Sequence, residues 1–461
     1  MVRAAAWLAA SPLRWVGALL LLALVRGLVY AWAVPPWQHP DEPTHFEHVA
    51  LVALRGALPG VQGYDVPLRR AIAESMERHG FWQDGSPPLD DASLDVPSST
   101  IGYTTLAQPP LYYLAAAWWL RPWVGMPIET QLQALRVFSV LLNLILVALG
   151  FFTARALSPS QPAIQAAVTA SLVFQPMLTD IMAAVNNDAM ANVLAAGFFL
   201  VLAWIFRRGA SLARLLLAAI LLAGTLLAKT TGLALLASVP LAMLAYSLRL
   251  GGRARVIYLM VLLGGLALAG AAAGGALDRL LPELVPLMNR YLRADVVRSI
   301  AQLLDPERRN IYLVAAIVVF KSFWGSFGWR GVWLPNSAYW ALAGVTAAVV
   351  LGGLRAALGA RSRGEASGGR AGYLGFGFLA VLVAWGLAIV RAQAYQGALS
   401  YLSHGRYAFV AIVPFALCFT LGWRGLFPAR RERVALMAYG LALVAFDAYA
   451  FWGVLIPHFH G

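Results

Sequence analysis

Apolar runs of 18 or more residues recur along this chain, and short segments that carry most of its charges separate them. A run of that length can cross the hydrocarbon core of a bilayer as one α-helix. Of the 461 residues, 60% are hydrophobic and only 12% are charged, a composition that excludes an ordinary soluble protein of this size. The sequence therefore predicts an all-α integral membrane protein, a polytopic helix bundle.

We expect about eleven spans in a single domain of residues 1–461. They are predicted near residues 13–34, 131–157, 161–184, 188–206, 211–228, 231–249, 254–277, 335–355, 373–392, 405–423 and 434–456. The first is long enough to serve as an uncleaved anchor, although Ala31-Trp32-Ala33 resembles a signal-peptidase site. Two further apolar stretches, 109–124 and 311–329, are predicted to lie along the outer interface or to re-enter it.

Arginine clusters predict the orientation, because cytoplasmic loops of membrane proteins are rich in basic residues. Four such clusters contain only two acids, Glu365 and Glu432. The clusters are Arg207, Arg208 and Arg214; Arg249, Arg253 and Arg255; Arg355, Arg361, Arg363 and Arg370; and Arg424, Arg430, Arg431 and Arg433. All four are cytoplasmic if the N-terminus is inside and neither extra stretch crosses, which leaves the C-terminus extracytoplasmic.

These clusters also account for much of the net charge of +14, so the charge favours membrane topology over a nucleic-acid partner. Only two of the 35 basic residues are lysines, which is typical of a GC-rich bacterial genome. We therefore expect a bacterial cell membrane. The single cysteine, Cys418, lies in an apolar run and excludes a disulfide framework or a cysteine metal site.

Two long segments are predicted outside the membrane and one loop inside it. Residues 35–108 form the first extracytoplasmic loop and hold ten of the 21 acids. Residues 278–334 form a second extracytoplasmic segment, whose arginines fit either a solvated amphipathic helix or a lipid-phosphate site. The Gly/Ser/Arg-rich residues 356–372 are typical of a flexible cytoplasmic loop.

The start of the first outer loop, residues 35–47, places adjacent acids, Asp41 and Glu42, directly after the first span. Acids beside a bilayer are costly unless they face water, a partner or a substrate. Prolines resist a regular helix up to about residue 43, and apolar residues then recur at helical spacing to residue 57. We expect an interfacial amphipathic helix that holds both acids at the membrane surface.

Other polar groups are expected at the same face. They are His45 beside the acids, Gln108 and Tyr112 where the loop returns, Asn187 and Asp188 in an outer turn, Lys229 in the next outer turn, Lys321 and Arg330 in an aromatic run, and Arg406 and Tyr407 at the start of a span. Some of these have simpler interpretations: a helix N-cap for Asn187 and Asp188, and snorkelling for Lys229. Aromatic-belt packing explains the aromatic residues of the run but not Lys321 and Arg330.

Together, cations and carboxylates on one face suit transfer from an anionic lipid-linked donor. The cations would hold the phosphate leaving group, and a carboxylate would deprotonate the acceptor. The competing role is a divalent-metal site, because His39, Asp41, His45 and His48 lie close in sequence. The chain has no HExxH motif and no Cys/His pattern.

Two charges lie within predicted spans, Arg26 in the first and Asp447 in the last. Both are thirteen residues from the inner end of their span. Charges at that depth usually pair. The sequence predicts a salt bridge that docks the two helices.

Five segments of this chain resemble the GT-C superfamily of membrane glycosyltransferases. They are Pro40-Asp41-Glu42-Pro43-Thr44-His45-Phe46, Gln108-Pro109-Pro110-Leu111-Tyr112-Tyr113, Asn186-Asn187-Asp188, the aromatic run from Phe320 to Trp329, and Gly405-Arg406-Tyr407. More narrowly, the chain is similar to bacterial relatives of protein O-mannosyltransferases and of the lipid A aminoarabinose transferase, in a poorly characterised branch.

The resemblance implies a polyprenyl-phosphate-linked sugar donor, an envelope glycan, lipid or protein as acceptor, and chemistry at the extracytoplasmic face with inversion at the sugar carbon. It implies that Asp41 is the base or its close partner, that Asp188 is the second acid, and that Lys229 and Arg406 bind phosphate. Active relatives often carry His and Lys before the paired prolines, where this chain has Ala107 and Gln108. Lys321, Arg330 or Arg406 would then supply the missing cation.

Two other classes of function remain open at this stage. A lipid or polysaccharide transporter or scaffold without catalysis would show polar groups through the bundle and, often, repeated halves. The predicted spans here are mostly Ala, Leu, Val and Gly, which favours the enzyme. A lipid-carrier hydrolase or phosphatase would use the same acids with water as the acceptor.

Overall fold

The computed structural model describes residues 12–247, 309–362, 369–391 and 403–461, apart from residues 61, 83, 84, 86 and 88, together with positions 252, 256 and 260. Apart from two positions, the predicted span near 254–277 lies outside the described residues, as does the predicted outer loop up to residue 308. Residues 363–368 of the predicted cytoplasmic loop lie outside them as well.

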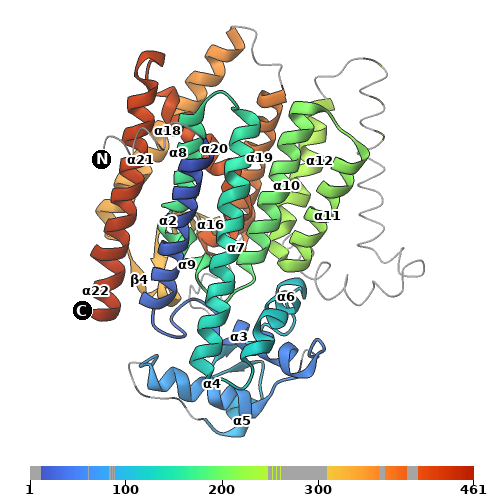
Figure 1. The fold of residues 1–461 in the computed structure, drawn as a ribbon, viewed down its shortest axis with the longest axis vertical. Coiled ribbons are helices and arrows are strands. Elements are labelled where there is room, and N and C mark those ends of the chain that lie inside the picture. Colours follow the sequence, from blue (N-terminus) through green and yellow to red (C-terminus); the bar gives the residue numbers. More distant parts are fainter. Residues whose placement is uncertain are drawn as a thin grey trace.

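Long helices packed side by side form a bundle, and a lobe of short helices covers one end of it (Figure 1). The helices of the first half are α2 (Pro12–Ala33), α3 (Glu42–Arg55), α4 (Val66–Arg78), α5 (Asp91–Leu94), α6 (Leu111–Leu120), α7 (Ile128–Leu157), α8 (Pro162–Val173), α9 (Pro176–Met182), α10 (Asp188–Arg208), α11 (Leu212–Ala228) and α12 (Leu233–Ser247). Those of the second half are α16 (Arg309–Trp324), α17 (Gly328–Gly331), α18 (Asn336–Ser362), α19 (Gly369–Val390), α20 (Ile412–Gly425), α21 (Glu432–Ala450) and α22 (Ile456–His460).

Short 3₁₀ segments and two hairpins complete the described chain. The 3₁₀ segments are η1 (Arg121–Trp123), η2 (Thr230–Gly232), η7 (Gly405–Ala411) and η8 (Ala429–Arg431), and a π-helical turn, η9, covers Phe451–Leu455. Strands β1 (Ser98–Ser99) and β2 (Gly102–Tyr103) pair antiparallel, with Ser98 opposite Tyr103. Strands β3 (Ser326–Phe327) and β4 (Val332–Trp333) do the same, with Ser326 opposite Trp333.

Seven helical segments in the described part of the chain are long and apolar enough to cross a membrane, and four shorter apolar helices accompany them. These helices identify the chain as a multi-pass membrane protein, while the expected number of eleven spans stays a prediction. One predicted span, 161–184, is not continuous: α8 ends at Val173 and α9 begins at Pro176. Proline lacks a backbone N–H and disfavours helix in the residue before it, so Pro176 breaks the span.

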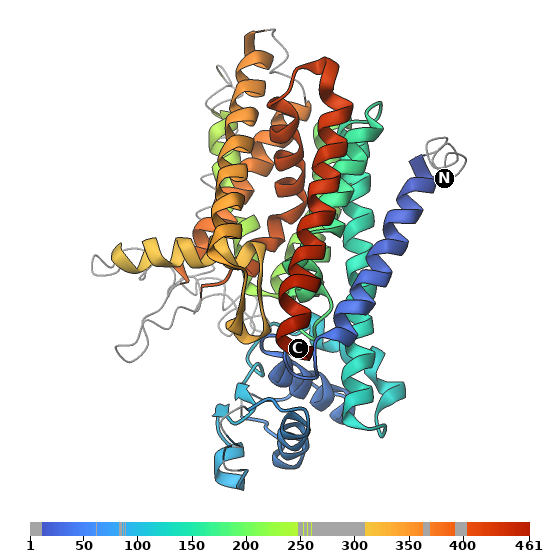
Figure 2. The ribbon, with the colours of Figure 1, turned by 90° about the vertical axis from the view of Figure 1, so that its left-hand side faces the viewer.

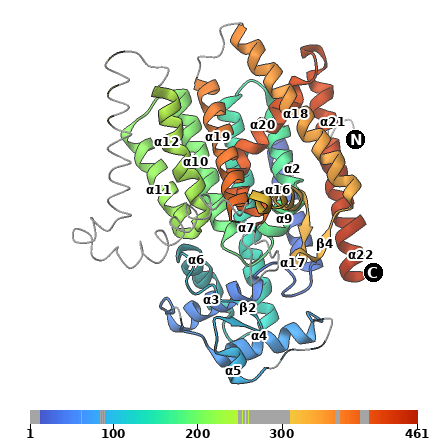
Figure 3. The same ribbon diagram turned by 180° about the vertical axis from the view of Figure 1, so that it is seen from behind.

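The two extra apolar stretches form short helices, α6 and α16. Helix α6 lies against the lobe (Figure 1), and α16 runs across the bundle rather than along it (Figure 2). The start of α2 and the C-terminal helix α22 lie at opposite ends of the bundle (Figure 2). The ends of α10, α18 and α20, which carry predicted cytoplasmic arginines, all lie away from the lobe (Figure 3). The predicted cytoplasmic arginines of these helices therefore lie at one end of the bundle, and the orientation of the chain in the membrane stays a prediction.

Helix α3 differs from its prediction as an amphipathic helix at the membrane surface. It is buried from Glu42 to Val52 on all sides and packs mainly against α6. Its acids are neutralised rather than hydrated: Arg69 Nε lies 2.6 Å from Glu47 Oε1, and Glu42 pairs with Arg136. Buried carboxylates persist when a cation pairs with them. Phe46, Val49 and their neighbours on α4 and α6 give the lobe its own apolar core.

The predicted salt bridge between the first and last spans is confirmed. Arg26 Nε lies 2.8 Å from Asp447 Oδ2, and the second guanidinium nitrogen, Nη2, contacts Oδ1. Arg26 also donates to Thr179 Oγ1 at 3.1 Å, and the Tyr30 hydroxyl lies 3.4 Å from Asp447 Oδ1. The pair therefore joins α2, α9 and α21 inside the bundle.

Candidate active site

Asp41 is the residue that precedes α3, and it adopts a left-handed conformation with φ 62°. Its backbone oxygen accepts hydrogen bonds from the Thr44 hydroxyl and the His45 amide, at 3.1 and 3.2 Å. Its side chain makes no capping bond to the helix. The backbone thus completes the turn, and the carboxylate, with 41% of the side chain exposed, is not used to cap α3.

Arg406 in η7 pairs with the Asp41 carboxylate. Its Nε also lies 3.8 Å from Asp188 Oδ2. Within the described residues, neither its Nε nor its Nη1 has a hydrogen-bond partner, although the side chain is only 6% exposed. Arg406 therefore has buried N–H donors available for an anion.

Close packing at Gly405 holds Arg406 in place. The Gly405 amide donates to Ser322 Oγ at 2.8 Å, and a Cβ at this position would lie 2.2 Å from the Phe323 nitrogen. The Arg406 amide donates to His404 Nδ1 at 3.1 Å. Only glycine allows η7 to approach α16 this closely.

Asp188 and Lys229 form a second, almost fully buried pair. Lys229 Nζ lies 2.7 Å from Asp188 Oδ2, with side-chain exposures of 9% and 2%. The cap of α10 is made by Asn186, whose Oδ1 accepts from the Ala189 amide at 3.2 Å. Asn187 makes no capping bond, and its buried side-chain amide has no hydrogen-bond partner among the described residues. Asn187 therefore occupies the N-cap position, but Asn186 supplies the side-chain hydrogen bond at this helix start.

Tyr407 forms an aromatic wall beside these charges. Its ring centroid lies 5.6 Å from Lys229 Nζ, 5.4 Å from Arg406 Cζ and 5.1 Å from Arg391 Cζ. Arg391 follows the last turn of α19 and donates to Thr230 Oγ1 at 2.8 Å. Arg391 was not expected at the site from the sequence, although a charge that ends a predicted span at the outer face is the same signal that identified Lys229.

Arg330 lies at the turn between β3 and β4, again in a left-handed conformation, with φ 67°. It is close enough to Arg406 and Tyr407 to interact electrostatically with both. The neighbouring Trp329 fixes this turn, because its Nε1 donates to the Trp37 carbonyl at 2.9 Å and its ring packs edge-on against Phe81. Arg330 is therefore a further cation at the edge of the cluster.

His45 lies beside the cluster as a neutral group. Burial and the nearby Lys229 cation lower its pKa to about 3. Its Nδ1 lies 2.8 Å from the Tyr113 hydroxyl. For Asp41, burial would raise the pKa, but the charges around the carboxylate, led by the Arg406 guanidinium, together lower the pKa to about 2. The cluster thus combines an ionised Asp41 with an uncharged His45 at neutral pH.

Four predicted site residues do not join this cluster through any contact of the described structure. Both oxygens of Glu42 bond to Arg136, at 2.9 and 2.6 Å, and they accept from the Val185 and Trp37 amides as well. Lys321 donates to Asn336 Oδ1 at 2.8 Å and lies over the Tyr339 ring. Tyr112 is buried against Tyr113 and Phe138. Gln108 is partly buried in the loop before α6.

The histidines considered as metal ligands point to different partners. His39 Nδ1 lies 3.2 Å from Asp180 Oδ1, His45 contacts Tyr113, and His48 Nδ1 lies 3.0 Å from the Thr105 carbonyl. In the part of the chain that the structure describes, no group of three or more His, Cys, Asp or Glu side chains is arranged to hold a metal ion.

The sequence profile of the family described as "Predicted membrane protein (DUF2142)" matches residues 24–417. The chain belongs to this family. Two solved structures have a similar fold, both of ArnT from Cupriavidus metallidurans. The complex with undecaprenyl phosphate has a TM-score of 0.51 at 12% identity, covering 96% of this chain and 70% of ArnT. The apo state has a TM-score of 0.50 at 11% identity, covering 96% and 77%.

No curated protein matches this member of the DUF2142 family. At 11–12% identity the ArnT structures show the fold alone, so this chain has an ArnT-like polytopic helical fold. The fold expected from the sequence resemblance is confirmed.

Proposed function

We propose that this DUF2142 protein is a glycosyltransferase that moves a sugar from a polyprenyl-phosphate donor to an acceptor at the extracytoplasmic face of the membrane. The observation that carries the proposal is the cluster of Asp41, Asp188, Lys229 and Arg406, two acids and two cations from four separate segments. The bound undecaprenyl phosphate in one ArnT structure supports a polyprenyl-phosphate partner.

In this proposal the cations bind the donor phosphate. Arg406 has two buried N–H nitrogens without hydrogen-bond partners among the described residues, and Lys229 lies on the far side of Asp188. Arg391 and Arg330 extend the positive charge past Tyr407. Guanidinium groups match phosphate oxygens in geometry, and fixed cations stabilise the charge that develops on a phosphate leaving group.

Asp41 is then the general base, since it is the acid of the cluster whose carboxylate is open to solvent, with 41% of its side chain exposed. It accepts the proton of an acceptor hydroxyl or amine as that atom bonds to the sugar carbon. The bond from the same carbon to the phosphate oxygen breaks, and polyprenyl phosphate leaves. Attack opposite the leaving group inverts the sugar carbon.

Pairing with Arg406 makes Asp41 a weak base in the resting enzyme, because its pKa is lowered to about 2. When Arg406 turns to the donor phosphate, Asp41 loses this partner and its basicity rises. Donor binding would therefore activate the base. Asp188 keeps Lys229 and Arg406 oriented, and Glu42 acts only as a positioning residue, through Arg136.

The test is release of polyprenyl phosphate from a panel of polyprenyl-phosphate sugars, with purified protein in lipid, with and without EDTA. We expect release from one donor that Asp41→Asn removes while the protein stays folded, with only a small loss of thermal stability. Asp95→Asn is the matched control, an exposed acid in the same loop. It should leave release unchanged. Loss on adding EDTA would identify a divalent-metal requirement.

Product analysis and donor binding separate the alternatives. A sugar on an envelope glycan, lipid or protein supports the transferase, whereas free sugar identifies a hydrolase. If no donor binds and none is consumed, even with an envelope extract as a source of acceptor, the proposal fails and a transporter or scaffold takes its place.

A further inference from the structure

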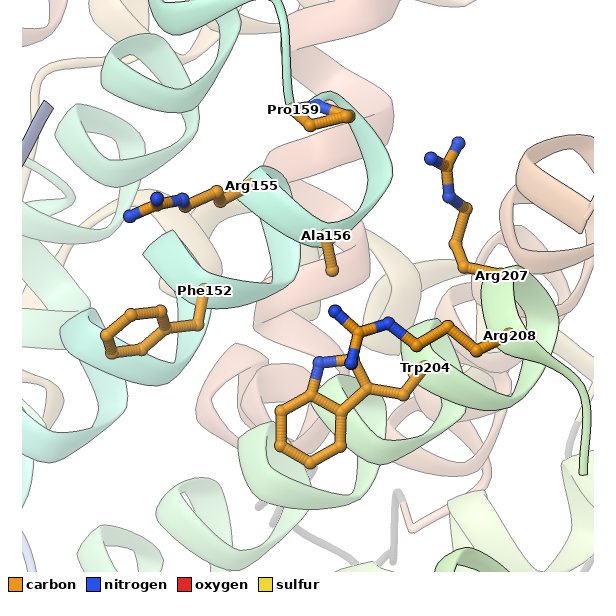
Figure 4. Close-up of a pocket in the computed structure, with 7 residues that line it drawn as sticks. All are labelled: Phe152, Arg155, Ala156, Pro159, Trp204, Arg207 and Arg208. Carbon is orange, nitrogen blue, oxygen red and sulfur yellow. The ribbon is translucent and has the colours of Figure 1, made fainter. Parts of the chain in front are cut away.

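A cavity of about 350 Å³ lies at the end of the bundle opposite the Asp41 cluster. Figure 4 shows Phe152 and Arg155 projecting from the last turns of α7, and Trp204, Arg207 and Arg208 from the last turns of α10. This volume is within the range of small-molecule sites in proteins. The cavity is therefore large enough for a small polar headgroup.

The three arginines at this cavity have no acidic partner in the described part of the chain. Other arginines at the same end differ. Arg424 pairs with Glu432 at 3.1 Å, and Arg214 donates to the Gly209 carbonyl at 2.6 Å. Three cations thus border one hollow, and none of them pairs with an acid of the described chain.

The cavity also has an apolar side. Phe152 is 45% exposed on an α7 helix that is long and apolar enough to cross a membrane, and the Trp204 ring lines the same hollow. Tryptophan is enriched where hydrocarbon meets headgroups. Cations above an apolar, partly exposed wall match a molecule with an anionic head and an acyl tail.

We propose that this cavity binds the phosphate headgroup of an anionic phospholipid. Arg155, Arg207 and Arg208 contact the phosphate oxygens, since guanidinium groups donate in the paired geometry that phosphate accepts. Phe152 and Trp204 contact the start of the acyl chains. The site joins the ends of α7 and α10. Because α10 begins at Asp188, a lipid bound here contacts the helix whose other end carries a residue of the Asp41 cluster.

The test is native mass spectrometry of delipidated protein titrated with phosphatidylglycerol or, separately, with phosphatidylcholine. The variant is Arg155→Gln/Arg207→Gln/Arg208→Gln. We expect it to bind the first phosphatidylglycerol about tenfold more weakly or worse, because the phosphate loses its charge-assisted hydrogen bonds. Phosphatidylcholine should bind weakly to both proteins.

The matched control is Arg430→Gln/Arg431→Gln/Arg433→Gln, which removes the same charge from exposed positions of η8 and α21. It should keep wild-type affinity. If both triple variants bound phosphatidylglycerol equally weakly, the binding would reflect general attraction between basic loops and anionic lipid. That result would overturn the proposal.

Two further outcomes would also overturn it. One is unchanged phosphatidylglycerol binding in the cavity variant. The other is displacement of the lipid by inorganic phosphate at equal concentration, which would identify a site for a free anion. Melting temperatures of both triple variants in detergent without added lipid should match wild type, because the replaced side chains make no ion pair among the described residues.

Discussion

Arg406 and Asp41 are 365 residues apart in the chain, yet the guanidinium of one pairs directly with the carboxylate of the other. The contact joins the first outer loop to η7, which continues into α20. Asp41 is available for it because the residue adopts a left-handed conformation and its side chain makes no capping bond to α3. Arg406 reaches it because Gly405 lets η7 pack against α16. The pair is therefore a product of two backbone features.

Replacing Arg406 should change how activity depends on pH. In the wild type the pKa of Asp41 is lowered from 3.8 to about 2, so the pair stabilises the fold above pH 3.8 and this contribution is lost as the pH falls toward 2. Arg406→Gln removes the largest opposing charge and raises the pKa of Asp41. As the pH is lowered, the normalised rate of polyprenyl phosphate release should then begin to fall at a higher pH than in wild type, because Asp41 becomes protonated earlier.

The control for this profile is Lys321→Gln. The sequence suggested Lys321 as a phosphate contact, but its ammonium binds Asn336. We expect both the shape and the maximum of the profile to stay near wild type. A profile for Arg406→Gln that superimposes on the wild-type curve would contradict the role of Arg406 in setting the pKa of Asp41.

Glu42→Gln should lower stability more than Asp41→Asn does, because the Asp41 carboxylate is 41% exposed. Glu42 and Arg136 are fully buried, and Arg136 also donates to the carbonyls of Ala31, Val34 and Pro35. Removing one charge leaves the other buried and unpaired, which costs about 3–5 kcal/mol. Thermal unfolding in detergent should show a clearly larger drop in melting temperature for Glu42→Gln than for Asp41→Asn. Equal melting temperatures for the two variants would refute the separation of a structural acid from a chemical one.

Exchanging the charges of the intramembrane pair should rescue its single variants. Arg26→Asp and Asp447→Arg each place two like charges together inside the bundle, so we expect low expression and a lower melting temperature. The double variant restores opposite charges between α2 and α21. Its yield should recover in part, because the Thr179 and Tyr30 contacts are arranged for the native order. A double variant as poor as the worse single one would argue that the helices do not dock through this pair.

Gly405→Ala should disturb both stability and activity. The new Cβ would lie 2.2 Å from the Phe323 nitrogen and 2.6 Å from the Val319 carbonyl oxygen, which are backbone atoms that cannot move aside easily. Helix α16 must shift, and Arg406 moves with η7. Gly440→Ala is the comparison, because its Cβ would meet nothing within 4 Å and helices favour alanine over glycine by about 1 kcal/mol. We expect a lower melting temperature and slower release for the first variant only.

Much of the architecture follows from local sequence patterns. Apolar length predicted most of the described long helices, and arginine clusters predicted which of their ends lie together. The break in the predicted span 161–184 shows that mean hydropathy does not detect helix interruptions. Pro176 hardly changes the mean hydropathy of the segment, but it interrupts backbone hydrogen bonding. The pairing of Arg26 with Asp447 was predictable because charged side chains within membrane spans are rare and usually pair with one another.

The sequence by itself determined that polar residues gather at one end of a membrane bundle, since apolar length and charge act residue by residue. Only the tertiary structure decided which of those residues meet. Asp41 and Glu42 are adjacent and chemically alike, but Arg136 binds one and Arg406 the other. Lys321 was expected in the cluster and lies by Asn336, while Arg391 lies beside Tyr407. Such choices depend on side-chain direction and on close packing between distant segments, which no local pattern encodes.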